Sequence, residues 1–410
     1  MRRLATVPTT LATLATVTAL TALAACSSST SGTPSASVTS SPAAPSSPSS
    51  SSAPAPSSSS APAPASVAAA RVLAGMSEQQ RVGQLLMVDC PTSGVAAATT
   101  AAIAQDAVGS VILDGTSQAG VGPIRAITDQ LQSQAPKGVG LFVATDQEGG
   151  EVQRLQGPGF TNIVSAVQQG SIPPATLQGY AQGWGQQLKA AGVNIDLAPV
   201  FDTVPAGFGS NPPIGDLDRE YGNTPDVVAA HALAVQRGLM SAGIDVTPKH
   251  FPGLGRVHGN TDLTSGVTDT VTTANDPYLQ PFRQAIAAGA PFVMMSTAIY
   301  DRLDPGTPAA FSKTIVTGLL RGQLGFNGVV ISDDLGAAKQ VSGYTWGQRA
   351  VDFVAAGGDV VLTVSAEAAA PMTQALLQRA DSDPAFKQLV DAAALRVLQA
   401  KAALGLLSTD

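Results

Sequence analysis

Short apolar runs rich in β-branched residues recur along the chain from residue 80 onward, separated by longer stretches with helical spacing. Each run is a few residues long and apolar at consecutive positions, which is typical of strands buried on both faces of a parallel sheet. We therefore expect eight strands, at residues 85–90, 110–113, 140–145, 194–200, 243–248, 291–296, 328–332 and 359–364.

Stretches rich in Ala, Gln and Leu lie between these runs and predict helices. The clearest are at 124–134, 176–190 and 225–242, and an amphipathic helix is expected at 389–404. A regular succession of strand and helix predicts βαβ units, and therefore an α/β fold. Eight such units favour a closed (β/α)8 TIM barrel, with an open doubly wound sheet as the alternative.

Charged residues gather directly after several of the predicted strands. Barrel enzymes carry their chemistry on the loops that follow the carboxyl ends of the strands. Charge at the end of a buried strand is costly unless it is paired or used. The pattern therefore predicts an active site at this end of the barrel, with a salt-bridge network that closes the barrel as the alternative. The residues concerned are Asp146, Glu148, Asp202, Lys249, His250, Asp333 and Asp334.

The first 25 residues have the pattern of an export signal. Arg2 and Arg3 precede a long apolar, Thr-rich run that ends in Leu-Ala-Ala directly before Cys26. A positive end, an apolar stretch and small residues are typical of a secretory signal, and the last four residues resemble a bacterial lipobox. That resemblance implies that Cys26 is lipidated and anchors an exported protein to the outer face of the cell membrane. A membrane-spanning anchor that happens to contain a Cys is the alternative.

The remainder divides into a linker at residues 26–66 and a single folded domain at 67–410. The linker is nearly all Ser, Pro, Ala and Thr without charge, so it cannot bury enough apolar surface to order itself. Cys90 is the one Cys besides Cys26, which leaves no intrachain disulfide for the domain. The net charge of −7 and the absence of a basic patch argue against nucleic-acid binding. We expect a monomer.

The segment around the seventh predicted strand resembles the signature of glycoside hydrolase family 3. Residues 319–336 read LLRGQLGFNGVVISDDLG. In that signature the Asp that follows the strand is the nucleophile, and the matching residue is Asp333. A carboxylate fixed at a strand end can attack an anomeric carbon and form a covalent glycosyl-enzyme. Strand geometry points the neighbouring Asp334 in another direction, so we expect it to support the site.

A second segment, KHFPGLG at 249–255, resembles the motif of the single-domain β-N-acetylglucosaminidases of that family. The resemblance implies that Lys249 and His250 bind sugar hydroxyls. It extends to TDQEGG at 145–150, where Asp146 would hold the outer hydroxyls of the terminal sugar. Arg154 and Arg219 would also contact the substrate. Together the matching segments cover about residues 70–405.

The resemblance fails at the position of the general acid/base. The family places Asp, Ser or Thr, and then a catalytic His where this chain has Asn260, Thr261 and Asp262. Asp262 is the first candidate for the missing proton donor, because two carboxyl groups about 5–5.5 Å apart are the usual retaining arrangement. His258 is the alternative, since the ordinary pKa of a His suits acid/base work. The third possibility is that neither residue serves.

These motifs predict a retaining exo-β-glycosidase, most simply a β-N-acetylglucosaminidase that releases terminal GlcNAc from cell-wall-derived fragments. The expected partners are a carbohydrate substrate and the membrane, and no metal or organic cofactor is implied, because no cluster has metal-ligand spacing. An ionised acid/base carboxylate would repel phosphate, so we expect hydrolysis rather than phosphorolysis. The alternatives are a β-glucosidase or β-xylosidase of the same family, and a carbohydrate-binding lipoprotein without activity. Glycines in the loop at 253–265 favour mobility, with ordering around substrate.

Overall fold

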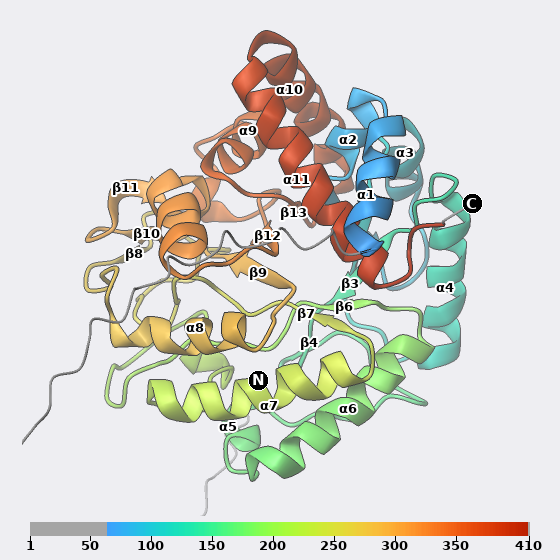
Figure 1. The fold of residues 1–410 in the computed structure, drawn as a ribbon. Coiled ribbons are helices and arrows are strands. Elements are labelled where there is room, and N and C mark those ends of the chain that lie inside the picture. Colours follow the sequence, from blue (N-terminus) through green and yellow to red (C-terminus); the bar gives the residue numbers. More distant parts are fainter. Residues whose placement is uncertain (1–63, 409–410) are drawn as a thin grey trace, which may run out of the picture. The chain divides into compact units, whose positions relative to one another are not determined.

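The computed structural model describes residues 64–408, in which strands and helices alternate along the chain (Figure 1). The predicted export signal, Cys26 and nearly all of the predicted linker lie outside the described residues. The first helix, α1, spans Pro64–Gly75 and so begins within the last residues of the predicted linker. In the described part of the chain, no helix is both long and apolar enough to cross a membrane.

All eight predicted strand runs contain a strand, so the strand prediction is confirmed. The strands are shorter than predicted at several places, because the runs end in residues that leave the hydrogen-bonding ladder. They are β1 (Leu86–Pro91), β2 (Ser110–Asp114), β3 (Phe142–Thr145), β6 (Ile195–Asp196), β7 (Asp245–Val246), β9 (Phe292–Met295), β12 (Val329–Ser332) and β13 (Val361–Thr363).

Six of these strands form one curled parallel sheet in the order β13-β1-β2-β3-β6-β7. Strands β9 and β12 form a separate parallel pair. Single parallel bridges lie on both sides of this pair, between Phe251 and Met295 and between Ile331 and Val360. The α/β class and the parallel sheet predicted from the sequence are thereby confirmed, and the carboxyl ends of the strands meet at one end of the domain.

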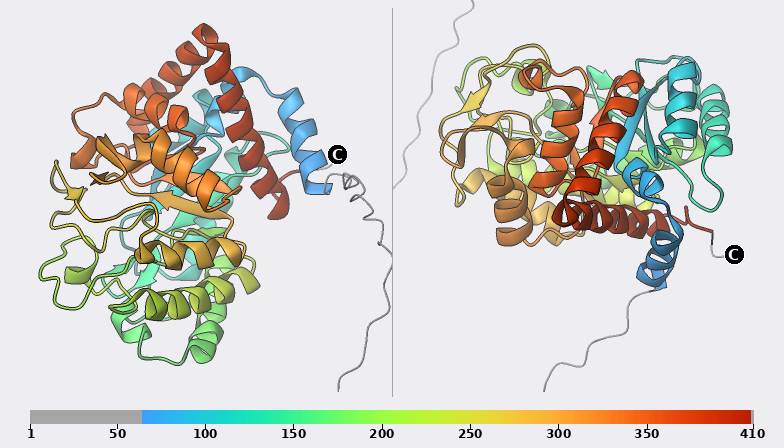
Figure 2. Two further views of the ribbon diagram at one scale, coloured as in Figure 1. Left: turned by 60° about the vertical axis from the view of Figure 1, so that its left-hand side comes forward. Right: turned by 90° about the horizontal axis from the view of Figure 1, so that it is seen from above.

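Helices cover the outside of the strands (Figure 2). The four predicted helices are all present, and proline at the first helical turn helps to start three of them, where a missing N–H costs nothing. They are α4 (Val121–Gln134), α6 (Pro174–Ala190), α7 (Pro225–Ser241) and α11 (Pro384–Ala403). The other helices are α2 (Glu78–Gly83), α3 (Ala97–Gln105), α5 (Ala166–Gln169), α8 (Gln280–Ala287), a π-type helix (Thr314–Gln323), α9 (Trp346–Ala356) and α10 (Ala369–Ser382).

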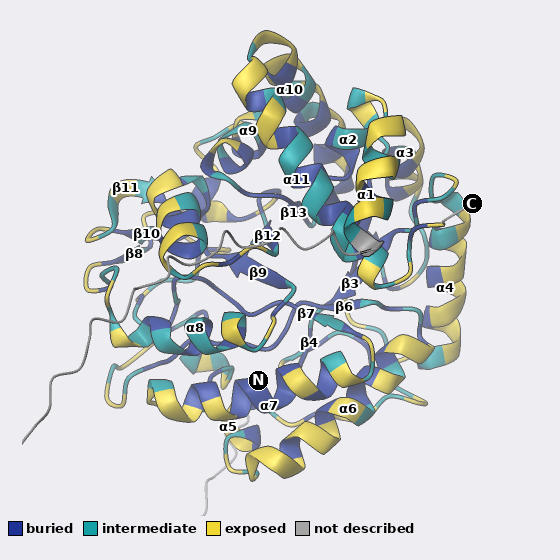
Figure 3. Cartoon of the chain, in the orientation of Figure 1, coloured by how far each residue is buried: buried dark blue, intermediate teal, exposed yellow. Residues whose placement is uncertain are grey.

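The hydrophobic core has an inner and an outer part. Alternate strand residues point inward, where Phe142 packs edge-to-face on Phe292 with ring centroids 5.5 Å apart. The others point outward against the helices, whose exposed faces are seen in yellow in Figure 3. Lys401 of α11 lies fully buried near the amino ends of β1 and β2, where it donates to Gln84 Oε1 at 2.7 Å and to the Gly109 carbonyl at 2.8 Å.

Two small sheets lie in the loops beyond the carboxyl ends of the main strands. Directly after β3, the strands β4 (Gln147–Gly149) and β5 (Val152–Gln153) form an antiparallel hairpin. The second small sheet contains β8 (Thr268–Asp269), β10 (Ile299–Tyr300) and β11 (Asp304–Pro308). Both sheets give the loops around the functional site a regular hydrogen-bonded framework.

Candidate active site

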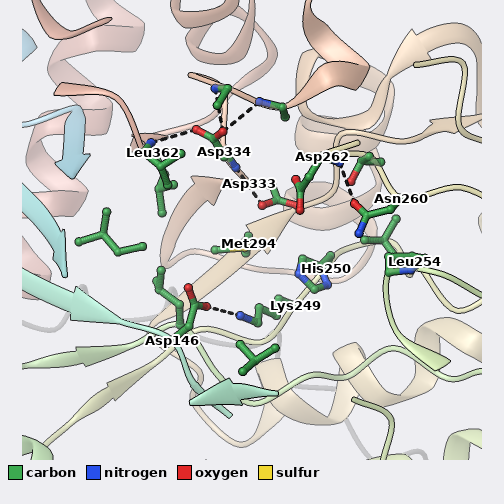
Figure 4. Close-up of a pocket in the computed structure, with 18 of the residues that line it drawn as sticks. Asp146, Lys249, His250, Leu254, Asn260, Asp262, Met294, Asp333, Asp334 and Leu362 are labelled. Atoms are coloured by element: carbon green, nitrogen blue, oxygen red, sulfur yellow. Dashed lines mark hydrogen bonds and ion pairs between the residues drawn. The ribbon is translucent and has the colours of Figure 1, made fainter. Parts of the chain in front are cut away.

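A cavity of about 360 Å³ opens at the carboxyl ends of the strands (Figure 4). Its walls come from loops that follow β2, β3, β6, β7, β12 and β13, together with inward-facing apolar residues of the strands. The structure therefore brings together seven of the eight residues predicted for catalysis and substrate binding. These seven are Asp146, Arg154, Arg219, Lys249, His250, Asp262 and Asp333.

One side of the cavity carries a buried cluster of alternating charge. The Lys249 ammonium lies 2.6 Å from Asp146 Oδ1 and 2.6 Å from Glu148 Oε1. Arg219 binds both oxygens of Glu148, at 2.8 Å from Nε and 2.7 Å from Nη2. Such bidentate pairs fix the direction of the guanidinium group as well as its position. Glu148 thus orients two of the cations predicted to contact the substrate, Lys249 and Arg219.

The positive and negative charges of this cluster balance at neutral pH, because the neighbouring buried carboxyl group of Asp196 is protonated. Burial alone would raise the pKa of Glu148, but Arg219 and Lys249 outweigh it and hold that pKa well below its usual range. Burial likewise opposes the charge on Lys249, yet Asp146 and Glu148 raise its pKa. Asp196, beneath them, accepts the Gln147 N–H at 3.0 Å, and burial raises its pKa to about 8. The cluster therefore offers two cations and two carboxylates at neutral pH.

His250 is held by a fully buried carboxylate. Its Nδ1 lies 2.7 Å from Asp202 Oδ2, and Asp202 Oδ1 also accepts the Leu254 N–H at 2.7 Å. With Nδ1 engaged, Nε2 is the ring nitrogen left for a ligand. The sequence left the role of Asp202 open, and the structure makes it the partner that orients His250.

The two neighbouring carboxylates after β12 have different surroundings. The Asp334 carboxylate accepts four backbone N–H groups, three from residues 336–338 and one from Val364, at 2.8–3.0 Å. Within the described residues, the Asp333 carboxylate accepts one hydrogen bond, from the Asp334 N–H at 2.9 Å, and it lines the cavity. Asp334 is therefore committed to holding the loop, which leaves Asp333 available to a substrate.

Asp262 lies beside Asp333, and both side chains reach the same part of the cavity (Figure 4). Part of Asp262 faces solvent, but the cavity walls crowd its carboxyl group. This desolvation, together with the negative charges of Asp333 and Asp334, raises the pKa of Asp262 to about 6. A carboxylic acid with that pKa can hold a proton at mildly acidic pH and release it to a neighbour, as acid/base work requires.

His258 is the predicted residue that the structure does not place in the cavity. Its exposed ring stacks on Phe208, with centroids 4.4 Å apart and planes within 6°. Its Nδ1 lies 3.2 Å from the carbonyl oxygen of Ser210. His258 is therefore not brought together with Asp333 in this structure, because the loop turns its side chain away from the cavity.

Arg154 lies just beyond β5 and lines the cavity as predicted. Its Nε atom is buried and has no hydrogen-bond partner within residues 64–408. A buried donor without a partner is costly, which suits a group that binds a ligand oxygen. The sequence placed Glu148 among the charges at the strand ends but gave it no role, and the structure makes it the shared partner of Arg219 and Lys249.

Comparison with known proteins agrees with this geometry. The family model for the glycosyl hydrolase family 3 N terminal domain matches residues 78–400. A beta-hexosaminidase of Xylella fastidiosa (strain M23) is 37% identical over 289 residues, which are 67% of this chain and 83% of the relative.

Solved structures give the same result. A beta-N-acetylhexosaminidase from Beutenbergia cavernae is 49% identical, with a TM-score of 0.79, over 80% of this chain and 99% of that one. A family 3 beta-N-acetylglucosaminidase from Paenibacillus sp. str. FPU-7 is 30% identical, with a TM-score of 0.75, over 81% of this chain and 63% of that one. The resemblance inferred from the motifs is confirmed, and the chain belongs to glycoside hydrolase family 3.

Proposed function

We propose that this protein is a retaining β-N-acetylglucosaminidase that removes terminal GlcNAc residues. The observation that carries the proposal is the pair of carboxyl groups, Asp262 and Asp333, in one cavity opposite a cluster of sugar-binding cations. Relatives that match most of this chain are named as hexosaminidases, which supports the same substrate class.

In the first step, the Asp333 carboxylate attacks the anomeric carbon while protonated Asp262 gives its proton to the departing oxygen. The glycosidic bond breaks and a covalent glycosyl-enzyme forms. In the second step, ionised Asp262 takes a proton from water, whose oxygen attacks the same carbon and frees Asp333. Lys249, His250 and Arg219 hold the sugar hydroxyls and strengthen their contacts as positive charge develops on the ring.

The experiment compares hydrolysis of 4-nitrophenyl β-N-acetylglucosaminide with that of the matching β-glucoside. We expect turnover of the acetamido sugar, and a loss on the order of 10⁴-fold or more in Asp333→Asn, because a missing nucleophile removes the covalent route. Asp381→Asn, on the exposed face of α10, is the matched control and should keep full activity. Hydrolysis of the β-glucoside alone would assign the chain to the other substrate class of the family.

Asp262→Ala tests the acid/base role separately. The 4-nitrophenyl group leaves with little protonation, so this variant should slow chiefly at the second step and recover when azide replaces water as acceptor. Retention of sugar binding without turnover in the wild type would instead favour a carbohydrate-binding protein.

We further propose that the eight strands close into a (β/α)8 barrel and that the chain is exported and lipid-anchored through Cys26. Closure is supported by the single bridges on both sides of the β9–β12 pair.

An anchored enzyme outside the membrane would meet cell-wall-derived fragments as substrates. Cys26→Ala should move the protein from the detergent-extractable fraction to the soluble exported fraction, and an unchanged distribution would contradict the anchor.

A further inference from the structure

The loop that carries Asp262 is fastened to the loop that follows the nucleophile strand. The Lys339 N–H donates to the Asp262 carbonyl at 3.2 Å, and the Gln340 N–H donates to the Thr261 carbonyl at 2.9 Å. Both donors belong to a single turn of 3-10 helix, Lys339–Val341. The backbone of the candidate acid/base is thereby fixed from outside its own loop, whose glycines alone predict mobility.

The side chain of Gln340 adds a second fastening at the far end of the same loop. Its Oε1 accepts the Val267 N–H at 2.9 Å, and its Nε2 donates to the Val267 carbonyl at 3.2 Å. Gln340 and Val267 are both buried. One residue therefore binds the Asp262 loop on both sides of Asp262, through its main chain at Thr261 and through its side chain at Val267.

The fastening continues to the nucleophile. Asp334, next to Asp333, accepts the N–H groups of residues 336–338 directly before the Lys339–Val341 turn. Six residues, 334–339, separate Asp333 from Gln340 along the chain. The distance between the two reacting carboxyl groups is thus set by one hydrogen-bonded unit rather than by two independent loops.

The hydrogen bonds from Lys339 and Gln340 matter because position 262 holds an Asp. An Asp side chain is shorter than the His that the family motif places there, so it reaches the glycosidic oxygen only if its backbone is held close. We propose that Gln340 is a positioning residue that holds Asp262 in register with Asp333. This inference rests on the proposed acid/base role of Asp262, and it assigns to Gln340 a function that acts only through that residue.

The test compares Gln340→Ala with Asp262→Ala on two substrates that differ in leaving group. Methyl β-N-acetylglucosaminide needs full protonation of its leaving group, and the 4-nitrophenyl glycoside needs little. Gln340→Ala should lower kcat/KM on the methyl glycoside by about 10²-fold, as misplacement by roughly 1 Å does, with little change on the aryl glycoside. The double variant should lose no more than Asp262→Ala alone, because the two changes remove one function.

Gln132→Ala is the matched control. Gln132 makes the same pair of bonds to one residue, accepting the Leu141 N–H at 3.0 Å and donating to the Leu141 carbonyl at 2.9 Å, at the opposite end of the strands. Gln132→Ala should lower the free energy of unfolding by a similar amount, but it should leave the ratio of kcat/KM on the two substrates unchanged. Lys339→Pro is the second variant if Gln340→Ala does not fold. It removes the N–H that binds the Asp262 carbonyl, and the Lys339 side chain that it replaces is exposed.

Three results separate the possibilities. Equal losses on both substrates, or additive losses in the double variant, would make Gln340 a structural residue only and overturn the inference. If Asp262→Ala itself shows no dependence on the leaving group, the proposed role of Asp262 fails, whatever Gln340→Ala does. A selective loss in both single variants supports the proposal.

Discussion

The alkaline limb of the pH profile should lie near pH 6, because the proposed mechanism requires protonated Asp262 for the first step. Burial and the charges of Asp333 and Asp334 raise the pKa of Asp262 from 3.8 to about 6. The group is protonated below that pKa and ionised above it, so activity falls as pH rises. For a pKa of about 6, the protonated fraction falls roughly 90-fold between pH 5 and pH 8.

The assay is kcat/KM for methyl β-N-acetylglucosaminide between pH 4 and pH 9, since this parameter reports the free enzyme up to the first irreversible step. The limb reports the ionisation of Asp262, whose pKa is raised by burial and by the nearby negative charges of Asp333 and Asp334. The 4-nitrophenyl glycoside should give a much shallower limb, and Asp262→Ala should abolish the limb on the methyl glycoside. A limb near the ordinary carboxyl value, or one that persists in Asp262→Ala, would refute the reasoning.

Three further predictions concern charge. Glu148→Gln leaves Lys249 and Arg219 as buried cations that lack one anionic partner. Urea unfolding should therefore show a free energy of unfolding about 3–5 kcal/mol lower than in the wild type, and KM should rise. Wild-type values of both would contradict the central role of Glu148. Inorganic phosphate should not yield sugar 1-phosphate, because ionised Asp262 repels it, and formation of that product, measured by chromatography, would refute this. Burial lowers the pKa of Lys401 from 10.5 to about 7. Above pH 7 the unfolded chain therefore holds more protons than the folded one, so the free energy of unfolding should rise towards pH 10. Lys401→Met should lose this rise, and an equal rise in the variant would contradict the role of Lys401.

The order of the elements could be predicted from the sequence because hydrophobic patterning sets it. Runs that are apolar on both faces predicted all eight strands. Stretches rich in Ala, Gln and Leu, together with one amphipathic pattern, predicted the helices α4, α6, α7 and α11. The lengths of the strands could not be predicted as well. Residues 194–200 read as one strand, yet only Ile195–Asp196 is paired as such, because the backbone turns into the loop that carries Asp202.

The site was predictable as a set of residues but not as a set of pairs. Strand-end position and motif resemblance placed Asp146, Lys249 and His250 in one cavity. That Glu148 connects Lys249 to Arg219 depends on how the β4–β5 hairpin folds back, which no local pattern specifies. The position of His258 outside the cavity is similarly set by residues distant in the sequence, Phe208 and Ser210.

The change at position 260 is consistent with the change at position 262. Where a His is the acid/base, a neighbouring Asp orients it. Beside Asp262, another carboxylate would add a negative charge near Asp333 and Asp334, which already raise the pKa of Asp262 to about 6. A still higher pKa would favour proton donation but keep the group from acting as the base of the second step. Asn260 avoids this charge, and its Oδ1 instead accepts the Asp262 N–H at 2.8 Å. Asn260 therefore holds the backbone of the proposed acid/base, whereas an Asp at this position orients the side chain of a His.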